Sequence, residues 1–209
     1  MVKKKMNYKI YNGKSLKKYF ENSKILLLTL LFSIGTTVGS ITVNNNSLMS
    51  DKINNFINTY ISFKTGQGIC ETFIYSLISN TVFIFVSIFL SFSLIGFTLI
   101  IWIPFLKGLG IGAVCGYFYS TYKLIGFGYC LLTIIPGATV AVFALISVCN
   151  SGYDYSKNAF LKSIFGNGQF EKGETKYFLI RQTVYILICT VSALIDALFS
   201  FIFSRIFEF

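Results

Sequence analysis

The sequence has no histidine and few charged residues, and these scarcities exclude whole classes of function. Charged side chains make up 12 % of the 209 residues, and only eight residues are acidic. Without histidine there is no histidine-based catalytic triad and no haem ligation by histidine. The scattered carboxylates form no acid–base pair, and no glycine-rich run has the spacing and strand–helix context of a nucleotide-binding loop. We therefore expect a protein that is not an enzyme and that uses no cofactor.

The cysteines also lack the spacing of a metal site or a redox centre. No two of the five are separated as in CxxC, and four of them lie within or at the ends of apolar runs. They are Cys70, Cys115, Cys130, Cys149 and Cys189. Cysteines in such surroundings behave as small hydrophobic residues, so we expect no metal site.

Charge and proline are scarcest in the stretch 72–149, around which the chain is organised. Lys107 and Lys123 are its only charged residues, and Pro104 and Pro136 are its only prolines. An apolar helix needs about 20 residues to cross a hydrocarbon core of about 30 Å, so three crossings fit here. The apolar runs are continuous rather than alternating, which favours helices over a transmembrane β-barrel. The predicted fold class is all-α, a polytopic integral membrane protein.

The remaining apolar runs complete a prediction of about five transmembrane helices. The first is interpreted as an uncleaved signal-anchor rather than a cleaved export signal, because its basic region is long and its apolar run almost spans a membrane. A sixth crossing would require a division at Lys107, which leaves too short a piece on one side. The predicted spans, within a transmembrane domain of residues 24–209, are 24–43, 72–94, 97–120, 127–149 and 177–203.

The placement of the basic residues predicts the orientation. The net charge is +10, and eight of the 18 basic residues are lysines at or before Lys24. Cytoplasmic segments of membrane proteins are enriched in lysine and arginine, so the tail 1–23 and the lysine-bearing loop 150–176 are predicted to be cytoplasmic. Attraction to anionic lipid headgroups accounts for the basic tail, and we expect no binding to nucleic acid.

One sizeable segment, 44–68, is predicted to lie outside the cytoplasm. Its apolar residues recur at steps of four and three, which indicates one face of an amphipathic helix. The residues of this face are Met49, Ile53, Phe56, Tyr60 and Phe63. Three interpretations stay open: the helix lies in the headgroup region, packs back onto the bundle, or docks a partner protein. For the third, Met49, Ile53, Phe56 and Tyr60 form the candidate docking face.

Two ionisable residues, Lys107 and Asp196, are predicted to lie inside crossings. A charge near the bilayer centre costs about 2.5–3.5 kcal/mol on insertion scales, so each residue needs a partner or a water-filled cavity. One hypothesis is a buried Lys107–Asp196 pair that fixes the packing of the two helices. In the alternative, Lys107 snorkels to an interface beyond a helix break at Pro104, and Asp196 lies near the outer headgroups.

Glycines and a proline shape two of the predicted crossings. Gly108, Gly112 and Gly116 recur every four residues on one helical face, where small residues let another helix approach closely. Pro136 falls midway along the span 127–149 and is predicted to kink it by removing a backbone hydrogen bond. Such a kink is a packing feature or, as in some transporters, part of a substrate path.

Four short motifs together resemble one family of bacterial membrane proteins. They are Leu106-Lys107-Gly108 before a glycine-rich crossing, Leu124-Ile125-Gly126 at a turn, Pro136 in the next crossing, and Leu194-Ile195-Asp196-Ala197 in the last. The combination, over most of residues 70–200, is similar to the stage II sporulation protein M family. The chain departs from that family in having Gly137 and Ala138 after the proline, and an aspartate in place of the usual glutamate in the last crossing.

The resemblance implies a non-enzymatic scaffold in the bacterial cell membrane that recruits or positions peptidoglycan-remodelling proteins, as in engulfment of the forespore. The expected partners are then membrane lipid, peptidoglycan hydrolases or other membrane and extracytoplasmic proteins, and a second copy of the chain. The alternative is a small transporter or permease subunit with the Lys107–Asp196 pair and the Pro136 kink near a central path.

Overall fold

The protein folds as a helical bundle. The computed structural model describes residues 23–43, 69–165 and 173–204, and these ranges contain no β-strand. Their elements are the helix Ser23–Val43, α3 (Ile69–Ser91), α4 (Gly96–Ile100), α5 (Trp102–Tyr129), the π-helical segment η1 (Cys130–Ile134), α6 (Ile135–Phe165) and α7 (Glu174–Ser204). The predicted all-α class is confirmed.

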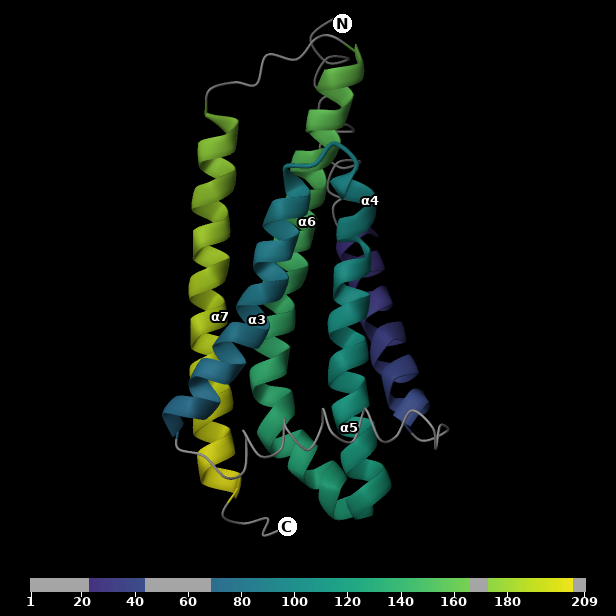
Figure 1. The fold of residues 1–209 in the computed structure, drawn as a ribbon, viewed down its shortest axis with the longest axis vertical. Coiled ribbons are helices and arrows are strands. Elements are labelled where there is room, and N and C mark those ends of the chain that lie inside the picture. Colours follow the sequence, from purple (N-terminus) through teal and green to yellow (C-terminus); the bar gives the residue numbers. More distant parts are fainter. Residues whose placement is uncertain (1–22, 44–68, 166–172, 205–209) are drawn as a thin grey trace, which may run out of the picture.

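Within the described ranges, four helical stretches are long and apolar enough to cross a membrane. They are Ser23–Val43, Ile69–Ser91, Gly96–Ile164 and Glu174–Phe203. The third has 69 residues, far more than one crossing requires. It turns back at Lys123, whose φ of 54° and ψ of −129° are not helical. As a result α5 and α6 lie side by side in opposite directions, and the long helices alternate in direction along the chain (Figure 1).

The helix α6 joins two segments that the sequence predicts as separate helices. One is the span 127–149, and the other is a short amphipathic helix, 155–165, within the predicted loop 150–176; α6 runs from Ile135 to Phe165 without a break. The extension is helical because one of its faces still packs against the bundle: Ser156 is fully buried and Ala159 almost so. Gly152 lies within this helix without ending it. A Cβ at this position would lie 2.3 Å from Ser91 Oγ, so the glycine allows the close approach of α6 to α3.

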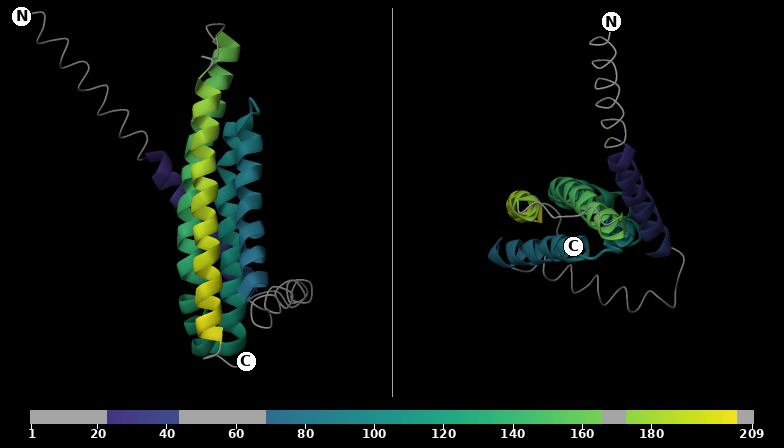
Figure 2. Two further views of the ribbon diagram at one scale, coloured as in Figure 1. Left: turned by 90° about the vertical axis from the view of Figure 1, so that its left-hand side faces the viewer. Right: turned by 90° about the horizontal axis from the view of Figure 1, so that it is seen from above.

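The bundle is apolar outside and rich in small residues inside, as expected of a protein surrounded by lipid. Phe89 is 78 % exposed and Leu124 80 %. The buried polar and charged residues are Thr72, Ser76, Ser87, Ser91, Lys107, Thr133, Ser156, Gln182, Ser192, Asp196 and Ser200. In lipid, association of helices depends on close packing of small residues and on hydrogen bonds rather than on burial of large apolar side chains. Figure 2 shows the resulting bundle from the side and from above.

A buried serine positions the start of α5. Ser156 on α6 donates a hydrogen bond to the Ser93 carbonyl at 2.6 Å and accepts one from the Phe97 N–H at 2.9 Å. The Ser93 carbonyl lies in the turn between α3 and α4 and also accepts the Gly96 N–H at 3.1 Å. The Phe97 N–H lies in the first turn of α4, where helical N–H groups have no partner within the helix. Ser156 therefore holds the turn against α6 and fixes the position at which α4, and after it α5, begins.

Candidate functional site: a polar cavity between the helices

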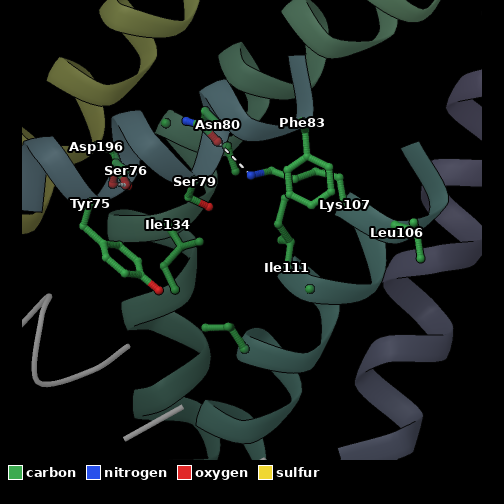
Figure 3. A pocket seen from close by; sticks show the side chains of 14 residues that line it. Tyr75, Ser76, Ser79, Asn80, Phe83, Leu106, Lys107, Ile111, Ile134 and Asp196 are labelled. Atoms are coloured by element: carbon green, nitrogen blue, oxygen red, sulfur yellow. Dashed lines mark hydrogen bonds between the residues drawn. The ribbon is translucent and has the colours of Figure 1, made fainter. Parts of the chain in front are cut away.

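A cavity of about 210 Å³ lies between α3, α5 and the junction of η1 with α6 (Figure 3). Its polar lining residues come from three helices: Tyr75, Ser76, Ser79 and Asn80 of α3, Lys107 of α5, and Asp196 of α7. The other lining residues are small or apolar: Phe83, Leu106, Gly110, Ile111, Val114, Ile134, Gly137 and Ala138. Both ionisable residues singled out in the sequence thus line one cavity.

Lys107 is buried, with 9 % of its surface exposed. Its Nζ donates a hydrogen bond to Asn80 Oδ1 at 2.8 Å and lies 4.9 Å from the centre of the Phe83 ring. The amide oxygen and the electron-rich ring face both stabilise an ammonium group in a low-dielectric interior. The side chain is directed into the bundle and does not snorkel to an interface.

Asp196 is equally buried, at 9 % exposure, and accepts a hydrogen bond from Ser76 Oγ. Its backbone approaches α6 closely, since a Cβ on Gly137 would lie 2.7 Å from Asp196 Cβ. Ser192, one turn earlier on α7, donates to the Gly137 carbonyl at 2.8 Å. The glycine after Pro136 therefore lets α7 bring its carboxylate to the cavity.

The two charged residues share a scaffold on α3. Ser76 and Asn80, which bind Asp196 and Lys107, are four residues apart and project from one face of that helix (Figure 3). The direct Lys107–Asp196 pair stays a prediction. Neither Ser76 nor Asn80 was predicted from the sequence as a site residue. Asn80 could have been, because it is the only amide side chain between residues 72 and 94.

Pro136 follows directly on the π-helical segment. The Ile135 N–H donates to the Cys130 carbonyl five residues back, one residue further than in an α-helix. Proline has no N–H to donate, so the helix ladder is already interrupted at this point. The wider turn sets the direction from which Ile134 and Gly137 reach the cavity, and π-helical turns of this kind are frequent at functional sites.

Gly108, Gly112 and Gly116 of α5 pack against the helix Ser23–Val43. A Cβ on any of them would meet backbone of that helix at less than an ordinary contact distance, and two glycines of the opposite helix meet α5 in the same way. The closest approaches are Gly108 to Phe32 O at 2.4 Å, Gly112 to Thr36 O at 2.1 Å, Gly116 to Ser40 O at 2.8 Å, Gly35 to Phe105 O at 2.3 Å and Gly39 to Leu109 O at 2.2 Å. Here two backbones touch because neither helix carries a side chain between them.

The predicted external docking face lies outside the described residues. Met49, Ile53, Phe56 and Tyr60 all fall in the segment 44–68.

The helices and the cavity define a multi-pass helical membrane protein that holds one cationic and one anionic side chain inside its bundle. The family model for stage II sporulation protein M matches residues 28–201, which is most of the chain. The chain therefore belongs to the stage II sporulation protein M family. A search of the curated proteins and a search of the solved structures found nothing that matches it.

Proposed function

We propose that this protein is a non-enzymatic scaffold of the bacterial cell membrane that positions peptidoglycan-remodelling proteins, as in engulfment during sporulation. Membership of the stage II sporulation protein M family is the observation that carries the proposal. The matched region, 28–201, takes in nearly all of the described helices, so the proposal concerns the bundle as a whole.

Hydrogen bonds between elements support the role of a rigid platform. Ser156 of α6 donates to the Ser93 carbonyl, and Ser192 of α7 donates to the Gly137 carbonyl of α6. Such bonds fix the positions of the helices relative to one another.

The proposed topology has five crossings, with the N-terminus in the cytoplasm. Lys24 pairs with Asp154 and Lys162 with Glu174, so the end of the bundle where α6 stops and α7 begins carries ionic groups. Together with the lysines of the tail, these groups suit the cytoplasmic side. The segment 44–68 and the turn at Lys123 then face outward, where cell-wall enzymes act.

The test is a pull-down of the tagged protein from detergent-solubilised membranes of its native host, in growth and in sporulation, with partners identified by mass spectrometry. We expect peptidoglycan hydrolases among the partners. A variant with Met49, Ile53, Phe56 and Tyr60 all changed to alanine should lose them. The matched control changes Asn54 and Asn58, on the other side of the same predicted helix, and should retain them.

Other outcomes would refute the scaffold. Recovery of a cytoplasmic ATPase in place of hydrolases would favour the permease alternative, and recovery of copies of this chain alone would leave the scaffold without clients. Hydrolases that bind the four-alanine variant as well as the unsubstituted protein would show that the docking surface lies elsewhere in the bundle.

A further inference from the structure

The cavity of Figure 3 contains one buried cation and one buried anion, which is the charge pattern that complements a zwitterion. We propose that it is a binding site for a small molecule of the α-amino acid class. Lys107 and the amide group of Asn80 would hold the carboxylate of the ligand. Asp196 and Ser76 would hold its ammonium group.

Charge balance excludes simpler ligands. A lone anion attracted to Lys107 would also face the Asp196 carboxylate, and a lone cation attracted to Asp196 would face the lysine. In a site of low dielectric such like-charge contacts are strongly unfavourable. A molecule that carries both charges satisfies both ends, and it replaces the hydration that each charge loses in the bilayer.

The arrangement of the polar groups sets the distance between the two ends of the ligand. Ser76 and Asn80 are four residues apart on α3, which corresponds to a rise of about 6 Å. Figure 3 shows Asp196 beside Ser76 and Lys107 directed toward Asn80, with Ser79 labelled between them. An α-amino acid bears its carboxylate and ammonium on one carbon, so it suits charged groups separated by this short interval.

The size of the cavity limits the ligand. A volume of about 210 Å³ holds roughly seven water molecules at about 30 Å³ each. Glycine, alanine and serine have a similar number of non-hydrogen atoms. The apolar lining residues include Ile111, Val114 and Ile134, and a Cβ on Gly110 would have nothing within 4 Å. These residues leave room for a hydrogen, a methyl or a hydroxymethyl group as the side chain of the ligand.

The experiment measures thermal unfolding of the full chain in detergent micelles, titrated with glycine, L-alanine and L-serine. We expect at least one of the three to raise the melting temperature in a saturable manner. N-acetyl-L-alanine, which lacks the ammonium, and L-alaninamide, which lacks the carboxylate, should have no such effect.

Three variants tie the effect to this cavity. Lys107→Met and Asp196→Asn should each weaken the apparent affinity by roughly 10- to 100-fold, as expected for loss of a hydrogen bond to a charged group. Gly110→Leu should fill the cavity and abolish the response while leaving both charges in place, so it remains informative if a charge variant fails to fold. Lys157→Met, at an exposed lysine of α6, should respond as the unsubstituted protein does.

Several results would overturn the proposal. They are no saturable stabilisation by any of the three amino acids, equal stabilisation by the N-acetyl or amide derivative, and an unchanged response of Gly110→Leu. Binding of a zwitterion does not depend on the scaffold role, and the pull-down does not depend on binding. The failure of one experiment is therefore distinguishable from the failure of the other.

Discussion

Contact between the backbones of α5 and the helix Ser23–Val43 predicts a sharp difference between two glycines of the same helix. A Cβ on Gly112 would lie 2.1 Å from the Thr36 carbonyl oxygen and 2.8 Å from Thr36 Cα, whereas a Cβ on Gly110 would have nothing within 4 Å. To reach an ordinary contact of 3.4 Å, the Thr36 carbonyl would have to move by about 1.3 Å. A single carbonyl inside a helix cannot move that far alone, so the two helices must separate.

The expected loss of stability follows from a comparison of Gly112→Ala with Gly110→Ala. Both changes gain up to about 1 kcal/mol of helix propensity, but only the first also strains the packing, at a cost of about 1–3 kcal/mol. We therefore expect Gly112→Ala to be less stable than Gly110→Ala by about 1–3 kcal/mol.

The assay is reversible unfolding in mixed micelles, titrated with a denaturing detergent and followed by loss of helicity. Equal midpoints for Gly112→Ala and Gly110→Ala would refute the reasoning, because they would show that the helix Ser23–Val43 does not press on α5 at this point.

Three further results are expected. Lys107→Met alone should lower the folded yield more than Lys107→Met combined with Asp196→Leu, because the single change leaves a buried carboxylate without a counter-charge; equal yields would count against a coupled pair. Ser156→Ala should cost about 1–3 kcal/mol of unfolding free energy, since the Phe97 N–H loses its partner and the Ser93 carbonyl keeps only the Gly96 N–H, whereas Ser147→Ala, which breaks only a bond within its own helix, should cost less; a reversed order would contradict the role of Ser156. In protoplasts, an impermeant maleimide should label Cys70, exposed at the start of α3, in a variant with no other cysteine; labelling only after permeabilisation would reverse the proposed orientation.

The fold class could be predicted from the sequence because the apolar runs in this chain are long and uninterrupted. A stretch such as 72–149, with two charges and two prolines, has no stable alternative to helices in lipid. The position of the reversal was also readable, since Lys123 is a charge between two apolar runs. The continuity of α6 across Asn150 was not, because the polar residues that follow resemble a loop in composition while one of their faces packs against α4 and α7.

The residues that line the cavity were only partly predictable from the sequence. Lys107 and Asp196 stand out because charges are rare in crossings, but Ser76 and Asn80 do not, since serine and asparagine in an apolar helix are compatible with many roles. Their significance depends on which face of α3 turns toward α5, and that depends on the packing of α3 against α6 and α7. Spacing within one helix cannot reveal a contact between helices.

The packing glycines of α5 and its cavity-lining residues lie on different faces of the helix, so a displacement caused on one face moves the other. Gly108, Gly112 and Gly116 face the helix Ser23–Val43, whereas Lys107, Gly110, Ile111 and Val114 line the cavity against α3. Backbone contact on the glycine face leaves α5 no freedom to withdraw from the cavity. The width of the cavity is therefore set from the opposite side of the helix. A side chain introduced at Gly112 should push α5 toward α3 and narrow the space near Lys107, so Gly112→Ala should weaken amino acid binding without altering any group that would touch the ligand. Unchanged binding in that variant would show that α5 and the helix Ser23–Val43 yield independently of the cavity.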